Sequence, residues 1–200
     1  MILRLAVLGD SIAAGQGASR REDTIAERLL RGLADAGVDA MARVFAVPGA
    51  RSCGLRGQVD RALDWTPHIA VVVIGANDVT HRTPPEEAAR ALAETVRRVR
   101  NVGGEVVVAP APDLSAVPHV PPAMRPAVRA ASDRLRRRQI AAAIVEGALI
   151  ADGYASMSGA FGADLSLFSA DRFHPSTAGY ALIAQGLLPH VIGAAHTIAD

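Results

Sequence analysis

The chain has 200 residues, of which 50% are hydrophobic and 20% are charged, so it is long enough to bury the core of an ordinary domain. A formal net charge of +1 gives no reason to expect a nucleic acid or an anionic membrane as a partner. All 21 basic residues are arginines, and the short arginine-rich run at residues 134–138 is interpreted as the solvated face of a helix.

Short apolar runs alternate with helical patterns along the chain, which predicts an α/β domain built on a parallel sheet. The nearly continuous valine, isoleucine and leucine content of these runs indicates strands buried on both faces. No linker divides the sequence, so residues 1–200 are expected to form a single domain. The expected strands are residues 2–8, 43–47, 69–74, 105–109 and 148–151.

The first strand begins almost at the first residue, without a charged leader, a signal-length apolar stretch or a small-residue cleavage site. This pattern favours a cytoplasmic protein. Cys53 is the only cysteine, which excludes an internal disulfide, and it is expected to be a buried, inert thiol.

Apolar residues at helical spacing predict four long helices. The first covers residues 25–33, with Asp23 as a candidate N-cap. The second runs from 85 to about 100 and opens with a proline, which suits the first turn of a helix. The third covers about 123–146, and the last follows Ser176, another candidate N-cap.

Residues 177–195 carry no charge and approach the length that spans a membrane. However, Gln185, Pro189 and His190 interrupt this stretch, and most of its apolar residues are alanines. We therefore expect a buried terminal helix and no stable membrane insertion.

Two irregular segments are predicted between the regular elements. Residues 110–122 hold five prolines and cannot form a helix. Residues 153–168 are rich in glycine, serine and alanine and are expected to form a second loop. Because loops after the strands of open α/β sheets line the ligand crevice, both segments are expected to shape a pocket.

Residues able to take part in chemistry follow each of the first three strands. Ser11 ends a Gly-Asp-Ser segment after the first strand, Gly49 follows the second, and Asn77 lies in a Gly-Ala-Asn-Asp segment after the third. The carboxyl ends of parallel strands meet at one edge of a sheet, so we expect these residues to lie close together.

Asp171 and His174 lie three residues apart near the other end of the chain. A serine hydroxyl is a poor nucleophile until an imidazole takes its proton, and a carboxylate must hold that imidazole in the right tautomer. The sequence therefore predicts a catalytic triad of Ser11, His174 and Asp171, if the fold brings the two ends of the chain together.

Acyl transfer also needs hydrogen-bond donors aimed at the oxyanion of the tetrahedral intermediate. Gly49 lets the backbone approach a ligand closely, so its N–H is one candidate donor. The Asn77 carboxamide supplies N–H groups without a charge. The N–H of Ser11 is a third candidate if this residue opens a helix.

Each of these residues also has a structural interpretation. A Gly-Asp-Ser segment is frequently only a turn that caps the next helix, and Asp171 can be a turn residue of its loop. Asn77 and Asp78 can form an Asx turn at the strand end. Asp10 is expected to orient the backbone around Ser11, and a structural role is preferred for Asp78.

The sequence gives no sign of a bound cofactor. The histidines other than His174 have no metal-ligand spacing with one another or with carboxylates. Glycines 9, 15 and 17 follow a strand, but the chain contains no lysine and the dinucleotide spacing is not met, which excludes the usual phosphate-binding loops. Neither a metal nor an organic cofactor is expected.

Ser11, Gly49, Asn77 and His174 occur in the order and contexts of the SGNH hydrolase superfamily, also called GDSL esterases and lipases, which the whole chain resembles. This resemblance implies a flavodoxin-like, three-layer α/β/α fold whose five-stranded parallel sheet has the order 2-1-3-4-5. It also implies the triad above and an oxyanion hole formed by the Ser11 N–H, the Gly49 N–H and the Asn77 side chain.

Two positions depart from the pattern of that superfamily. Ile12 stands where members commonly have leucine, and Val47 and Pro48 precede Gly49 without the polar residue often found there. Neither departure removes a reacting group.

The expected activity is that of a serine esterase that hydrolyses small-molecule carboxylic esters through an acyl-enzyme on Ser11. The resemblance allows short-chain esters, lysophospholipids, thioesters and acetylated sugars as substrates. The aromatic content of 4% mildly favours a small or flexible acyl group over stacked sugars. The alternatives are a carbohydrate O-acetyl esterase and a catalytically silent binding module on the same scaffold.

Overall fold

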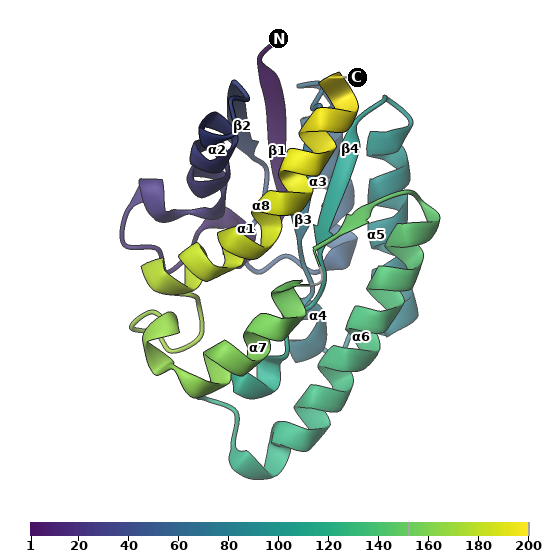
Figure 1. The fold of residues 1–200 in the computed structure, drawn as a ribbon. Coiled ribbons are helices and arrows are strands. Elements are labelled where there is room, and N and C mark those ends of the chain that lie inside the picture. Colours follow the sequence, from purple (N-terminus) through teal and green to yellow (C-terminus); the bar gives the residue numbers. More distant parts are fainter. Residues whose placement is uncertain (152, 200) are drawn as a thin grey trace.

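The computed structural model of the protein describes residues 1–151 and 153–199 (Figure 1). Five parallel strands form one sheet in the order β2-β1-β3-β4-β5, flanked by helices on both faces. The expected three-layer α/β/α architecture and its strand order are therefore confirmed. The strands are β1 (Leu3–Gly9), β2 (Ala40–Val44), β3 (Ile69–Val73), β4 (Glu105–Ala109) and β5 (Leu149–Ile150).

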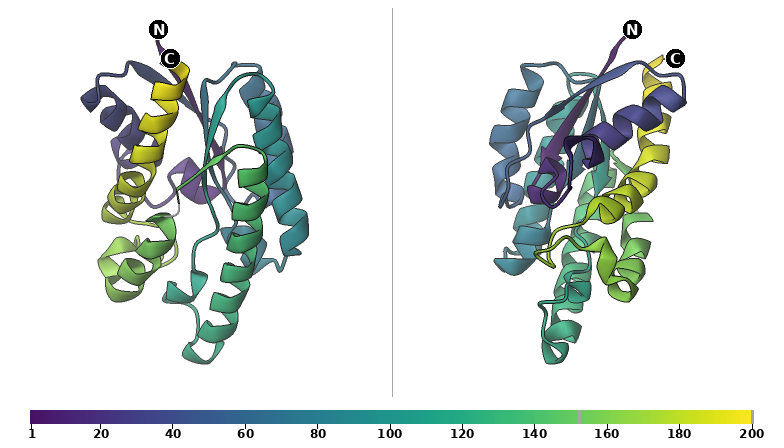
Figure 2. Two further views of the ribbon diagram at one scale, coloured as in Figure 1. Left: turned by 45° about the vertical axis from the view of Figure 1, so that its right-hand side comes forward. Right: turned by 90° about the vertical axis from the view of Figure 1, so that its left-hand side faces the viewer.

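Alternate residues of the central strands face two separate cores, because successive side chains of a strand point to opposite faces. One core packs against α2 (Ile25–Asp35) and α8 (Thr177–Ala199). The other packs against α3 (Leu55–Leu63), α5 (Pro85–Arg100) and α6 (Arg125–Val145). Figure 2 shows α8 and α5 on opposite sides of the sheet.

The edge strand β2 departs from the expectation in position and burial. It covers Ala40–Val44 rather than 43–47, although backbone hydrogen bonds from Phe45 and Val47 to β1 continue beyond it. Val44 is exposed because only β1 pairs with this strand. The prediction of burial on both faces is therefore wrong here, whereas all five residues of β3 are buried.

Of the two predicted N-caps, Ser176 is confirmed and Asp23 is wrong. The Ser176 hydroxyl accepts a hydrogen bond from the Gly179 N–H at the start of α8, which confirms Ser176 as an N-cap. Asp23 does not cap α2. It ends a 3₁₀ turn and pairs with Arg28 at 2.9 Å, and Thr24 is the residue that directly precedes the helix.

The prediction of a loop at residues 153–168 is wrong for most of that segment, which forms α7 (Gly153–Ala163) and a 3₁₀ turn (Leu165–Leu167). Weak helix formers are held here by packing: Met157 is buried, and the Phe161 ring lies edge-on to Phe168 with centroids 5.1 Å apart. By contrast, residues 110–122 are irregular as predicted, apart from 3₁₀ turns.

Cys53 is exposed, so the expectation of a buried thiol is wrong. It lies in a 3₁₀ turn whose inward-facing member is Ser52, which is fully buried. The arginine run at 134–138 lies on α6, and Arg134, Arg137 and Arg138 are exposed as predicted.

Helix α8 contributes Tyr180, Ile183, Leu187 and Val191 to the core, as expected for a buried terminal helix. Over Thr177–Ile198 it is also long and apolar enough to span a membrane by length and composition alone. A single helix of this kind is weak evidence for a membrane protein, because core helices pass the same test.

Candidate active site

The structure brings Ser11 and His174, which are 163 residues apart in the chain, into direct contact at the carboxyl edge of the sheet. The His174 Nε2 lies 3.0 Å from the Ser11 Oγ, and its Nδ1 lies 2.6 Å from an Asp171 carboxylate oxygen. Ser11 and His174 are both buried, at 7% and 9% exposure. A hydroxyl, an imidazole and a carboxylate are thus joined in one hydrogen-bonded row.

Ser11 is positioned by a sharp turn between β1 and the short helix α1 (Ser11–Ala14). Gly9 has φ +139°, and a Cβ there would overlap the Val73 carbonyl oxygen, so only glycine fits. The Asp10 carboxylate then accepts the Ile12 N–H at 3.0 Å and caps α1. Ser11 opens that helix, so its own N–H has no intrahelical partner.

Gln58 holds the end of β1, and none of the sequence motifs pointed to it. From α3, its amide accepts the Gly9 N–H at 2.7 Å and donates to the Gly9 carbonyl at 2.8 Å. The side chain is fully buried on the apolar face formed by Leu55, Val59 and Ala62. A glutamine at an apolar-face position of a helix is the signal that would have identified it.

Gln139 has a similar role beside the next strands of the sheet. It lies on α6 and accepts the Ala111 N–H at 2.8 Å after β4, while it donates to the Ile74 carbonyl at 3.3 Å after β3. Both buried glutamines therefore connect a covering helix to strand ends that carry the candidate site.

The loop of residues 168–176, here called the histidine loop, holds Asp171 in place. One Asp171 oxygen accepts hydrogen bonds from the Ser169 hydroxyl and from the N–H groups of Phe173 and His174, at 2.8–2.9 Å. Burial by itself raises the pKa of Asp171, but the hydrogen bonds from His174, Phe173 and Ser169 outweigh it and hold that pKa well below its usual range. The carboxylate is therefore ionised beside the imidazole.

The two other predicted donors lie beside each other. Gly49 has φ +80° in a turn closed by a hydrogen bond from the Ala50 N–H to the Val47 carbonyl at 3.0 Å. The Asn77 amide, on α4 (Ala76–Thr80), donates to the Ala50 carbonyl at 3.1 Å, which leaves its second N–H available. Within residues 1–151 and 153–199, the Gly49 N–H donates to no other group.

Two buried carboxyl groups lie behind these residues. Asp78 is fully buried and accepts hydrogen bonds from the Ser52 N–H and hydroxyl at 2.8–3.1 Å, which ties α4 to the turn before α3. Burial raises the pKa of Asp10 to about 7, and the charge of Asp78 adds to the rise, against hydrogen bonds from backbone N–H groups. Both carboxyls contact backbone or hydroxyl donors, in keeping with the structural roles expected for them.

An apolar cavity of about 50 Å³ lies next to the Ser11 and His174 pair. It is bounded by Ile12, which follows Ser11, and by Phe173 and Pro175, which flank His174. The other walls come from residues 112–117, from α7 and from α8. In the described part of the chain, no three histidine, cysteine, aspartate or glutamate residues are grouped to hold a metal ion.

This arrangement is suited to acyl transfer. An imidazole in contact with a hydroxyl can take its proton, and an ionised carboxylate on the far nitrogen favours the imidazolium that forms. Backbone and amide N–H groups near the same point can stabilise an oxyanion.

Sequence comparison identifies the family to which the chain is related. Residues 7–182 match the GDSL-like Lipase/Acylhydrolase family. The chain is 37% identical over 187 residues to the GDSL-like esterase Rv1075c of Mycobacterium tuberculosis. That alignment covers 92% of this chain and 60% of the relative, so the chain spans less than two thirds of that protein's length.

Solved structures show the same fold at low sequence identity. TesA is similar with a TM-score of 0.77 and 23% identity, covering 96% of this chain and 99% of TesA. A variant of Axe2, an acetyl-xylooligosaccharide esterase from Geobacillus Stearmophilus, gives a TM-score of 0.77 and 16% identity, with 94% of each chain covered. The family match extends over most of the chain and includes Ser11, Gly49, Asn77 and His174, so the chain belongs to the GDSL-like lipase/acylhydrolase family.

Proposed function

We propose that the protein is a serine esterase that hydrolyses small carboxylic esters through an acyl-enzyme on Ser11. The observation that carries this proposal is the unbroken row of contacts from the Ser11 Oγ through His174 to Asp171, at 3.0 and 2.6 Å. Membership of the GDSL-like family and the esterase name of the mycobacterial relative support the same activity.

In the first half-reaction, the His174 Nε2 takes the Ser11 proton as Oγ attacks the ester carbonyl carbon. The N–H groups of Ser11 and Gly49 and the Asn77 amide stabilise the resulting oxyanion. The His174 imidazolium then gives its proton to the leaving alcohol oxygen as the carbon–oxygen bond breaks, and the acyl group stays on Ser11.

In the second half-reaction, His174 takes a proton from water, and the hydroxide attacks the acyl carbon. Return of the proton to Ser11 releases the carboxylic acid and restores the enzyme. Asp171 stays ionised throughout and holds the Nδ1–H of His174, so that Nε2 faces the serine.

A carbohydrate O-acetyl esterase is the second candidate, because a cavity of about 50 Å³ also accepts an acetyl group. The fold similarity to Axe2, whose name gives that activity, keeps this candidate open. A clear preference for acetylated xylan over p-nitrophenyl butyrate would select it.

The test is labelling with a fluorophosphonate probe together with hydrolysis of p-nitrophenyl butyrate. The parent should be labelled and active, whereas Ser11→Ala should lose labelling and about four to six orders of magnitude in turnover. Ser19→Ala, which changes an exposed serine, is the matched control and should behave as the parent does. Parent-like activity in Ser11→Ala, or a parent that does not react with the probe, would contradict the proposal.

A further inference from the structure

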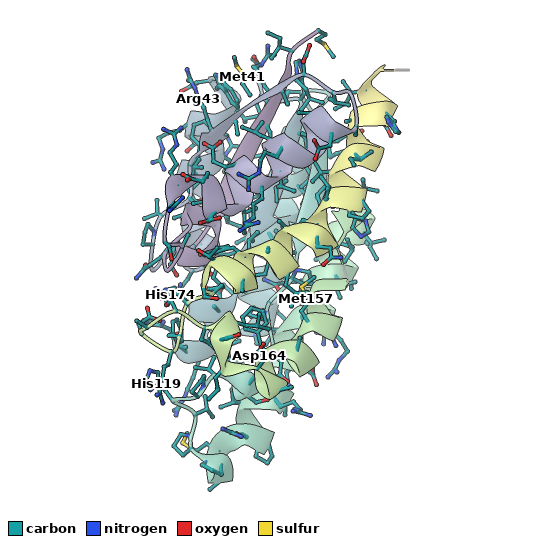
Figure 3. All side chains as sticks on the ribbon, turned by 60° about the vertical axis from the view of Figure 1, so that its left-hand side comes forward. Met41, Arg43, His119, Met157, Asp164 and His174 are labelled. Carbon is teal, nitrogen blue, oxygen red and sulfur yellow. The ribbon has the colours of Figure 1, made fainter. Side chains whose placement is uncertain are left out.

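His119 connects two loops that border the apolar cavity. Its Nε2 lies 2.8 Å from the backbone carbonyl oxygen of Asp171. A carbonyl oxygen only accepts hydrogen bonds, so this ring nitrogen carries the proton and donates. Figure 3 shows His119 and His174 along the same side of the molecule, toward the end away from Met41.

The two loops joined by this contact are each stabilised by hydrogen bonds of their own. In the histidine loop, the Ser169 N–H donates to the His174 carbonyl at 2.8 Å, and Phe168 pairs with Pro175. The loop of residues 110–122, here called the proline-rich loop, is fastened to α6 instead, for example by the Leu114 N–H on the Ser132 hydroxyl at 3.2 Å. Each loop therefore has hydrogen bonds that do not involve the other.

Across the described residues, the His119 contact is the one hydrogen bond that joins the proline-rich loop to the histidine loop. The two loops also share an apolar cluster, to which the proline-rich loop contributes Leu114, Val117 and Val120 and the histidine loop contributes Phe168 and Phe173. The spacing of the two loops consequently depends on one polar contact and a small apolar cluster.

The cavity lies between these loops. Leu114 and Val117 of the proline-rich loop form one wall, and Phe168 and Phe173 of the histidine loop form another. One water needs about 10–15 Å³ of such a cavity, so about 50 Å³ holds roughly four water-sized groups. An acyl chain of about four carbons therefore fills the cavity as the loops stand, and movement of the loops apart would give a longer chain more room.

We propose that His119 is a positioning residue that limits the length of the acyl chain by holding the proline-rich loop against the histidine loop. This inference rests on the proposed esterase function and makes esters of acyl groups up to about four carbons the preferred substrates. His119 touches neither Ser11 nor the His174 ring. It acts through the backbone of Asp171 and through the width of the cavity.

The variant that removes the contact should fold. His119 is exposed, and water can replace it on the Asp171 carbonyl, so no buried polar group is left without a partner. The carboxylate hydrogen bonds of Asp171 come from within the histidine loop and do not depend on His119.

The experiment measures kcat and KM separately for p-nitrophenyl acetate, butyrate, hexanoate and octanoate. His119→Ala should raise the ratio of octanoate to butyrate kcat/KM at least fivefold, mainly through a lower KM for octanoate, and leave acetate kcat within about twofold. His119→Gln keeps an N–H donor and should restore the parent ratio. His196→Ala, at an exposed position on α8, is the matched control and should leave the ratio unchanged.

A second series varies the alcohol of acetate esters, from methyl to hexyl. His119→Ala should leave this profile as it is in the parent, because the cavity takes the acyl side. An altered alcohol profile with an unaltered acyl profile would assign the cavity to the leaving group and overturn the inference.

The inference also fails if folded His119→Ala keeps the parent acyl profile, or if all chain lengths lose activity equally. These outcomes differ from failure of the proposed function. If Ser11→Ala hydrolyses the esters as well as the parent, or if the parent hydrolyses none of them, the esterase proposal falls and the inference with it.

Discussion

The two aspartates nearest to Ser11 and His174 in the chain have opposite surroundings. The Asp171 side chain is 45% exposed and accepts several hydrogen bonds, which hold its pKa well below the usual range. Asp10 is 1% exposed, and burial raises its pKa to about 7. One carboxyl is thus ionised at any working pH, while the other exchanges its proton near neutrality.

The raised pKa of Asp10 predicts a pH-dependent effect of Asp10→Asn on stability. An unfolded chain loses this proton near pH 3.8, whereas the folded protein keeps it up to about pH 7. The unfolded state therefore binds fewer protons between these values, and the parent loses stability as pH rises through that window. The free energy of unfolding of Asp10→Asn, relative to the parent, should increase from pH 4.5 to 7, as measured by urea denaturation.

Asp164→Asn is the matched control for that measurement. A hydrogen bond from Ser166 lowers the pKa of Asp164, so this carboxyl is ionised in both states above about pH 5. The difference in the free energy of unfolding between Asp164→Asn and the parent should stay constant from pH 5 to 7. If the free energy of unfolding of Asp10→Asn also differs from that of the parent by a constant amount over this range, Asp10 does not keep its proton in the folded protein.

Asn77 is the clearest single test of oxyanion stabilisation. Asn77→Ala should lower kcat for p-nitrophenyl butyrate roughly a hundred- to a thousand-fold with little change in KM, because the amide acts on the charge of the intermediate. Asn101→Ala, at an exposed position after α5, should have no effect. A loss of less than tenfold in folded Asn77→Ala would remove the side chain from the proposed oxyanion hole.

At the scale of elements, α3 and α6 each contribute one buried glutamine that fixes a strand end. Gln58 supplies the partner of the Gly9 N–H, whereas the Gly9 carbonyl also accepts the Val47 N–H at 3.1 Å. The helix thus anchors the turn that presents Ser11, and its position is linked to the position of the hydroxyl.

Gln58→Leu tests this link between α3 and the site. It leaves the buried Gly9 N–H unpaired and should cost about 1–3 kcal/mol of stability. Turnover should also fall, because the Ser11 turn loses its anchor. Urea denaturation and kcat should be compared with Gln185→Leu, an exposed position on α8. Parent-like stability and turnover in Gln58→Leu would mean that the hydrogen bonds between Gln58 and Gly9 are not needed to position Ser11.

Much of the sheet and of the site was predictable because the patterns that signal them are local. Apolar runs marked the central strands, and short polar or glycine segments marked Ser11, Gly49 and Asn77 at their ends. The Ser11 contact with His174 was expected from the resemblance to SGNH hydrolases, on the condition that the fold brings the two ends of the chain together, as the structure does.

The predictions that proved wrong concern segments where tertiary contacts override the local sequence pattern. Helix α7 contains several glycines and serines, which are weak helix formers, and the packing of Met157 and Phe161 is not revealed by its sequence. The choice of Ser52 over Cys53 as the buried residue depends on the carboxylate of Asp78, which is 26 residues away. Edge strand β2 is exposed because no strand covers its outer side.

At the scale of the molecule, the start of β1 and the last turn of α8 lie close together in all three ribbon views (Figures 1 and 2), whereas Ser11 follows the opposite end of β1. We therefore expect a circular permutant to fold, because a short linker can join these two nearby elements and a new break in an exposed loop leaves the core intact. Val102 and Gly103 form such a loop, where a Cβ at Gly103 would meet no other atom within 4 Å.

A permutant joined by a short glycine–serine linker and opened between Val102 and Gly103 should keep probe labelling and most of its activity. A permutant opened between Val117 and Pro118 should still be labelled but accept longer acyl chains, because its break frees the proline-rich loop. Thermal melts and fluorophosphonate labelling check both proteins. Loss of labelling in both permutants would show that the order of the chain is needed for the site, whereas loss in the first alone would assign the defect to the break after Val102.

Ser11 and His174 are 163 residues apart in the chain, so they are not synthesised at the same time. At about 5–20 residues per second, a ribosome adds His174 on the order of ten to thirty seconds after Ser11. Until then, the nascent polypeptide lacks the imidazole that contacts the Ser11 hydroxyl. If Ser11 and His174 act as proposed, translation that stops short of His174 should therefore release an inactive fragment.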